Sequence, residues 1–227
     1  NENVMIGLSA GKAGDNNWPQ ATDNVYIGSN AGRELDDGHS NVIIGKEAGK
    51  GNAAGGNATQ YGVFIGHKGA FVTTDTLRSI VIGNEAGYSM TIGSNSVIIG
   101  DQAGYTLTTT TNTVLIGKAA GFNINSTDAD GTVAVGYQAL QDLTSGQNNT
   151  AVGYRALADL TTGDYNTAVG YGALDAITTG LDNTALGWGA GGSTSNTTGA
   201  NNTFLGGSAG NQIINRNDNT FVGYRAG

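Results

Sequence analysis

The chain has 227 residues with a formal net charge of −8; 39 residues are glycine, one is proline and none is cysteine. The negative charge argues against a nucleic-acid or anionic-membrane partner, since both are bound through clustered Lys and Arg, and the lack of cysteine excludes disulfides and thiolate metal sites. No apolar run approaches the roughly 20 residues of a membrane span, so we expect no membrane insertion by this segment.

A glycine that follows a short apolar run recurs along the whole chain, and we call it the anchor glycine, position 0 of each repeat. The thirteen anchors are Gly7, Gly28, Gly45, Gly66, Gly83, Gly100, Gly117, Gly136, Gly153, Gly170, Gly187, Gly206 and Gly223. Most anchors are 17 residues apart, and four repeats are padded. A repeat this short cannot bury its own apolar face, so it must stack on its neighbours.

Residues −4 to −1 of each repeat are predicted to form a strand, because they are β-branched with a period of two and end at glycine. In chain order these strands are 3–6, 24–27, 41–44, 62–65, 79–82, 96–99, 113–116, 132–135, 149–152, 166–169, 183–186, 202–205 and 219–222. A second short strand is expected near positions −11 to −8. The predicted fold is all-β, a parallel β-solenoid (β-roll) of about thirteen 17-residue coils.

Two versions of the repeat divide the chain. Residues 1–121 carry a Val-x-Ile-Gly pattern and residues 122–227 a Thr-Ala-Val-Gly pattern, which we interpret as one repeat domain, 1–227. Both ends fall inside a repeat, so we expect a segment of a longer fibre. Position +3 is Ala in nearly every repeat, which predicts a buried corner with room for one methyl group.

The side chains of each strand should alternate between two faces. We expect positions −1 and −3, such as Val152, to point into the coil, and position −2 to point away from it. Position −2 is apolar in every repeat, and an exposed apolar stripe marks an interface. The predicted oligomer interface is Met5, Ile43, Phe64, Val81, Ile98, Leu115, Ala151, Ala168, Phe204 and Phe221.

The segments "NTAVGYRAL", "NTAVGYGAL" and "SVIIGDQAG" resemble the head repeats of YadA-type trimeric autotransporter adhesins and the repeats of phage tail-fibre proteins. The resemblance covers essentially the whole chain, although the 17-residue unit is longer than the adhesin head repeat. It implies a homotrimeric rod that belongs to an extracellular attachment fibre, on a virion tail or a bacterial cell surface. The implied partners are the chain itself and a host-surface glycan or protein receptor.

Two ladders of identical residues are candidate ligand surfaces. Tyr137, Tyr154, Tyr171 and Trp188 occupy position +1 of successive repeats and could form a sugar-binding platform or a structural stack. Trp18, in the first padded repeat, is a further recognition candidate. Threonines recur at position −9, either as an ice-binding face or as a ladder that hydrogen-bonds along the stack.

Nothing in the sequence indicates catalysis or a cofactor. His39 and His67 are the only histidines, and neither lies in a triad or at metal-ligand spacing. The fragments "DADG" and "DDG" lack the regular spacing of calcium loops and are read as polar turns. The predicted function is the structural shaft or head of an attachment fibre that mediates host or surface adhesion. The alternative is a carbohydrate-binding module that uses the aromatic ladder.

Overall fold

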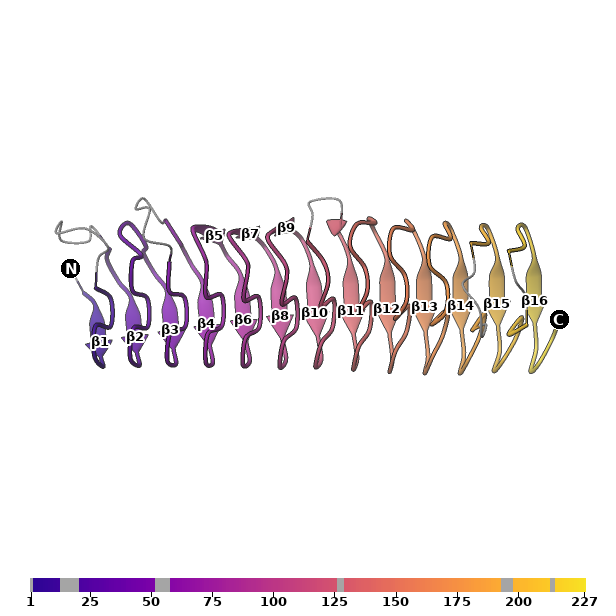
Figure 1. Ribbon diagram of the computed structural model, residues 1–227, viewed down its shortest axis with the longest axis horizontal. Coiled ribbons are helices and arrows are strands. Elements are labelled where there is room, and N and C mark those ends of the chain that lie inside the picture. Colours follow the sequence, from indigo (N-terminus) through magenta and orange to yellow (C-terminus); the bar gives the residue numbers. More distant parts are fainter. Residues whose placement is uncertain (1, 13–20, 52–57, 126–128, 193–197, 213–214) are drawn as a thin grey trace. The chain divides into compact units, whose positions relative to one another are not determined.

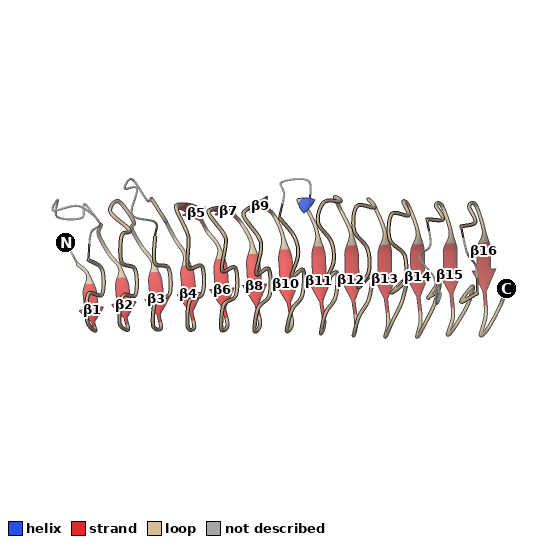
Figure 2. Cartoon of the chain, in the orientation of Figure 1, coloured by secondary structure: helices blue, strands red, loops and turns tan. Residues whose placement is uncertain are grey.

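The computed structural model describes residues 2–12, 21–51, 58–125, 129–192, 198–212 and 215–227. These residues contain no α-helix, only three-residue strands joined by turns and one short 3₁₀ segment at Ala129 (Figure 2). The main strands run parallel, with one strand in each repeat. This confirms the predicted parallel β-solenoid with its spacing of about 17 residues. The chain divides into two compact units, Asn1–Asn112 and Thr113–Gly227.

Unit 1, Asn1–Asn112, contains a main parallel sheet and a smaller one. The main sheet holds, in this order, β1 (Val4–Ile6), β2 (Val25–Ile27), β3 (Val42–Ile44), β4 (Val63–Ile65), β6 (Ile80–Ile82) and β8 (Val97–Ile99) (Figure 1). The smaller sheet holds β5 (Asp75–Leu77), β7 (Ile92–Ser94) and β9 (Thr109–Thr111). Single parallel bridges extend the smaller sheet through Leu77, Gln60, His39 and Thr22.

Unit 2, Thr113–Gly227, has one described sheet in which every strand pairs with the next along the chain. Its strands are β10 (Val114–Ile116), β11 (Val133–Val135), β12 (Thr150–Val152), β13 (Thr167–Val169), β14 (Thr184–Leu186), β15 (Thr203–Leu205) and β16 (Thr220–Val222). The register matches equivalent positions, so that Thr150 lies beside Thr167 and Ala151 beside Ala168. Each residue type therefore stacks on itself.

The second strand of the coil lies at positions −8 to −6 rather than −11 to −8, and in the described residues it forms only in β5, β7 and β9. The start at −8 has its cause at position −9. The carbonyl of Thr91 accepts hydrogen bonds from the backbone N–H groups of both Thr74 (2.9 Å) and Asp75 (3.1 Å). Two successive donors converge on one acceptor there, which an evenly spaced parallel ladder does not allow.

The two faces of each main strand are the reverse of those predicted. Position −2 points into the coil, and Val152, expected inside, is 37% exposed. The predicted interface residues that are buried in their own coil are Ile43, Phe64, Val81, Ile98, Leu115, Ala151, Ala168 and Phe204. Met5 in β1 and Phe221 in β16 belong to the same column but are partly exposed, because each has a coil on one side only. The predicted oligomer interface is therefore wrong, since its residues form the coil core.

An asparagine ladder explains why position −2 is the inner one. Position −4 has the same parity as −2 and carries buried Asn24, Asn41, Asn149, Asn166, Asn183 and Asn202. The Oδ1 of Asn166 accepts hydrogen bonds from the backbone N–H (3.1 Å) and the Nδ2 (3.0 Å) of Asn183. Its Nδ2 donates to the carbonyl of Gly180 at 2.8 Å. A buried amide without hydrogen-bond partners would be costly, and these amides find their partners inside the coil. Position −2 lies on the same side of the strand and therefore also points inward.

The two versions of the repeat fill the same core in different ways. In the first version position −2 is large and position +4 is mostly Gly; a Cβ on Gly49 would lie 2.8 Å from the Ile43 side chain. In three coils of the second version Ala134, Ala151 and Ala168 at position −2 accompany buried Leu140, Leu157 and Leu174 at position +4, whereas the last three coils again have Gly at position +4. The sequence change thus moves side-chain volume from the strand to the corner of the coil.

The corners are built as predicted around Ala, and they also require glycine. Ten of the twelve Ala residues at position +3, from Ala31 to Ala209, are fully buried, which confirms the corner with room for one methyl group, while Ala10 and Ala226 in the first and last coils are half-buried. The anchor glycines have φ between 125° and 145°. A Cβ on Gly170 would run into the Gly187 backbone of the next coil. Position 0 therefore combines a backbone conformation and a close approach that only glycine allows.

We predict that core volume can be exchanged within one coil. Ala151→Leu alone should overpack the core and cost about 1–3 kcal/mol, and Leu157→Gly alone should leave a cavity that costs about 2–5 kcal/mol. The double variant should recover most of both losses, since it recreates the first version of the repeat. Urea denaturation of all four proteins measures the coupling. Additive losses would contradict the exchange.

We predict that Gly170→Ala is severely destabilising. The new Cβ would clash with the Gly187 backbone of the next coil, and Gly170 also has a φ of 138°, which L-residues rarely adopt. The Gly187 backbone cannot shift to make room without separating two coils. The matched control is Gly172→Ala at position +2 of the same corner, where the nearest atom is 3.5 Å away and where Arg155 occupies the equivalent place with φ 52°. Thermal unfolding should show a large loss for the first variant and little for the second. Equal losses would overturn this account of position 0.

Candidate functional site

The outer face of each main sheet is the largest candidate interaction surface. In unit 1 both of its columns are aliphatic. The residues of these aliphatic columns are Val4, Val25, Val42, Val63, Ile80 and Val97 at position −3, and Ile6, Ile27, Ile44, Ile65, Ile82 and Ile99 at position −1. All are half-buried or exposed. Val4, Ile6 and Ile80 are exposed and the other nine are half-buried, so the columns form an apolar patch of the kind that marks an interaction surface.

The outer face of unit 2 changes its chemistry part of the way along. Position −3 is Val in β10 and β11, and then becomes the threonine column: Thr150, Thr167, Thr184, Thr203 and Thr220. The change falls at the pairing of Val133 with Thr150. Position −1 stays aliphatic through Val222. Within the described residues, none of the five hydroxyls in the threonine column has a hydrogen-bond partner.

The threonines at position −9, by contrast, use their hydroxyls along the stack. The Oγ1 of Thr74 donates to the carbonyl of Thr91 at 2.9 Å, and that of Thr161 donates to the carbonyl of Thr178 at 2.9 Å. The expected hydrogen-bonded ladder is confirmed for these members, while Thr127 and Thr197 lie outside the described residues. Hydroxyls directed along the stack offer little to an ice surface.

The aromatic ladder at position +1 is exposed, but its ring faces cover one another. Tyr137 and Tyr154 stack at 5.0 Å between ring centroids with planes 14° apart, and Tyr154 and Tyr171 stack at 4.9 Å and 5°. The stack presents ring edges and hydroxyls, whereas a sugar platform needs an open ring face. Trp188 is exposed beyond this stack, and Trp18 lies outside the described residues. The geometry favours the structural interpretation of the ladder.

A second aromatic stack at position +5 was missed by the sequence analysis. Phe71, Tyr88 and Tyr105 stack at 5.0 Å in unit 1. The Nζ of Lys50 lies 5.0 Å from the Phe71 ring centroid and covers the end of the stack. The signal was available, since these residues share one position of consecutive repeats. In the same unit His67 is exposed, and its Nδ1 lies 3.1 Å from the Oδ1 of Asn84.

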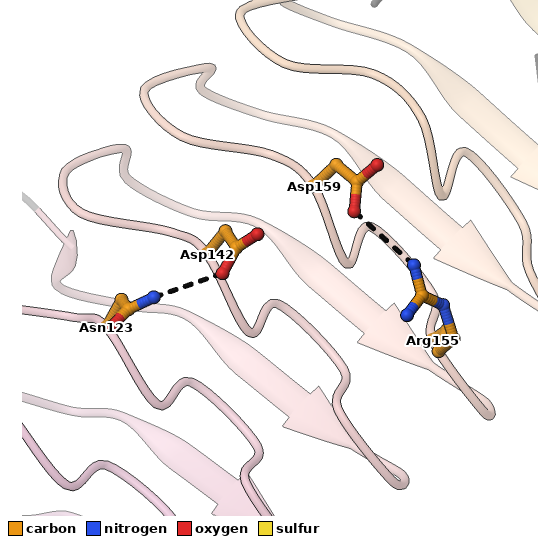
Figure 3. A network of polar contacts seen from close by, with 4 residues as sticks. All are labelled: Asn123, Asp142, Arg155 and Asp159. Carbon is orange, nitrogen blue, oxygen red and sulfur yellow. Dashed lines mark hydrogen bonds and ion pairs between the residues drawn. The ribbon is translucent and has the colours of Figure 1, made fainter. Parts of the chain in front are cut away.

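Two carboxylates of unit 2, those of Asp142 and Asp159, occupy the same position of successive repeats (Figure 3). Asp142 accepts a hydrogen bond from the Nδ2 of Asn123 at 3.0 Å, and Asp159 lies 3.5 Å from the Arg155 guanidinium. Burial raises the pKa of Asp159, an effect that Arg155 partly offsets and Asp142 reinforces. Burial also raises the pKa of Asp175, and the neighbouring Asp159 carboxylate raises it further. Ionising these partly buried, neighbouring carboxylates therefore lowers the free energy of unfolding.

The described residues contain no group of three or more His, Cys, Asp or Glu placed to hold a metal ion. They also include no helix with the length and apolar character needed to cross a membrane. Comparison of the chain with protein-family models, with curated proteins and with solved structures finds no match.

We predict that Asp175→Asn stabilises the protein at neutral pH. The folded-state pKa of Asp175 is raised, so the folded state binds more protons and stability falls as pH rises through that pKa. Acidification from pH 7 toward the ordinary value of about 3.9 should thus shrink the difference between variant and parent, which should vanish below about pH 3.5. Melting temperatures across this range test it. Asp182→Asn, at an exposed position in the same unit, should change nothing.

Proposed function

We propose that this chain is a structural segment, shaft or head, of an extracellular attachment fibre, and that it acts as a homotrimer on a virion tail or a bacterial surface. The observation that carries the proposal is the pair of aliphatic columns on the outer face of unit 1. A row of Val and Ile at this scale is costly to leave in water, and neighbouring coils cover only its sides. The same surface on the other copies of a trimer is the simplest cover.

The proposed contact between copies uses the outer face of the main strands, not position −2 as the sequence predicted. The predicted need for a partner stays, but the residues that meet it are those at positions −1 and −3. A stable interface takes about 800 Å² from each partner. Unit 1 presents twelve aliphatic side chains for such a contact, and in unit 2 the −1 column leaves others exposed, such as Leu186 and Leu205.

Hydrogen-bonded stacking of coils suits a mechanical role. Neighbouring coils are joined by backbone hydrogen bonds in the strands and at the corners, such as Gly170 N–H to the Val152 carbonyl at 2.8 Å. The asparagine ladder and the position −9 threonines add side-chain hydrogen bonds that also join one coil to the next. Load along the stack is therefore shared by many bonds per coil, and the resemblance to adhesin and tail-fibre repeats supports the same role. A glycan or protein receptor is the proposed target of the fibre.

We predict that the chain is a trimer at micromolar concentration, with three times the mass of the 22.9 kDa subunit by native mass spectrometry. Ile44→Lys with Ile65→Lys should dissociate it, because two charges per copy enter the apolar contact while the coil core is untouched. Circular dichroism should show that the β-structure persists.

The matched control places lysines at His67 and Asn84, which are exposed on another column of the same unit. This variant should remain a trimer. A parent chain that runs as a folded monomer would contradict the proposal, and so would an Ile44/Ile65 variant that stays fully assembled.

A further inference from the structure

We propose that one flank of unit 1 binds an acidic polysaccharide, whose carboxylates pair with a column of basic side chains. The inference rests on the proposed function and deepens it, because it names the chemical class of the surface receptor. The column is position +5, which holds in chain order Lys12, Arg33, Lys50, Phe71, Tyr88 and Tyr105. We call its first three members the basic column, and the aromatic stack described above follows them in the next three coils.

The basic column places three cations in successive coils. The backbone N–H of Glu34 donates to the carbonyl of Lys12 at 2.8 Å. The N–H of Gly51 donates in the same way to the carbonyl of Arg33 at 2.9 Å. Since neighbouring coils are about 4.8 Å apart, this arrangement stacks like charges, which is unfavourable without counter-ions.

The described residues supply only one such counter-ion. Arg33 pairs with Glu34 at 3.1 Å. Lys12 and Lys50 form no ion pair with a carboxylate of the described residues. Two positive charges of the basic column are therefore open to an anion from outside the chain.

Aromatic rings hold two ammonium groups in place at the end of the basic column. The Nζ of Lys50 lies 5.0 Å from the Phe71 ring centroid. The Nζ of Lys68, at position +2, lies 5.4 Å from the same centroid and 5.8 Å from that of Tyr88. Ammonium groups fixed in this way lose less freedom when an anion binds. Four of the ten Lys and Arg residues thus gather on this flank, although the chain has a net charge of −8.

The direction of the basic column favours a linear ligand. The column runs along the stack, and each coil rises by about the length of one sugar unit. A polysaccharide that lies along the column can therefore meet cations in several coils. Guanidinium and ammonium groups bind its carboxylates through charge-assisted hydrogen bonds.

A single-stranded nucleic acid fits this flank less well. Its bases bind by stacking on open aromatic faces, but Phe71 already stacks on Tyr88 at 5.0 Å and its ring is also covered by an ammonium group. Glu47 and Glu85 occupy the positions before and after Lys68 in its own column, and they would repel a phosphate at every unit. Carboxylates separated by neutral sugars meet less of this repulsion.

Hyaluronan oligosaccharides, which carry a carboxylate on every second sugar, are the probe for the test. Chitin oligosaccharides of the same length are the neutral control, and a single-stranded DNA oligonucleotide is the other polyanion. Titration calorimetry on the whole chain should show hyaluronan binding that weakens as salt is added, and no binding of the chitin oligosaccharides. Absence of hyaluronan binding would overturn the inference, and so would chitin or DNA bound as tightly as hyaluronan.

The deciding comparison removes the two ammonium groups at the aromatic stack. Lys50→Gln with Lys68→Gln should weaken hyaluronan binding about tenfold or more, because two charge-assisted contacts are lost. Lys50→Arg with Lys68→Arg keeps both charges and should bind like the parent. The matched control, Lys46→Gln with Arg78→Gln, removes the same charge from exposed positions on other columns of unit 1 and should change binding little. Equal losses in the two Gln variants, with melting curves like that of the parent, would overturn the inference.

Native mass spectrometry distinguishes failure of this inference from failure of the proposed function. A trimer that does not bind hyaluronan would overturn the polysaccharide site alone. A folded monomer that binds hyaluronan would overturn the trimer and leave the site in place.

Discussion

The close contact between one coil and the next at the anchor glycine is the constraint on which the rest of the structure depends. A Cβ at this position would run into the following coil, as at Gly153, so the glycine permits the stacking distance that lets strands pair. Stacking then allows each coil to bury its −2 side chain and to satisfy its backbone. A coil without neighbours could do neither, which is why the sequence must repeat.

In-register stacking places every residue on its own counterpart, and this rewards some side chains and penalises others. Asparagine is favoured at position −4 because one amide both donates and accepts, so Asn149, Asn166 and Asn183 form a continuous chain of hydrogen bonds. Tyrosine rings stack on their faces. Carboxylates repel one another: burial raises the pKa of Asp159 most, and its counterpart Asp142 raises it further.

In-register stacking lets the inner and the outer face of the coils vary independently of one another. Inside, Ala151 with Leu157 fills a core that elsewhere holds Ile43 with Gly49, so the two versions of the repeat are equivalent there. Outside, they differ, because the Val of β10 and β11 gives way to Thr from β12 onward. The two versions of the repeat therefore differ most on the face that does not hold the coil together.

The sequence by itself determined the period, the strands that precede the anchors, the buried Ala corner and the parallel solenoid, because each depends on spacing and local residue type. It did not determine which face of the strand points inward. Alternation defines two faces, and here both are apolar, so burial alone could not choose between Ile98 and its neighbours. The buried partners of Asn24 and Asn166 on the inner side made the choice, and these lie one coil away, where only the tertiary structure places them.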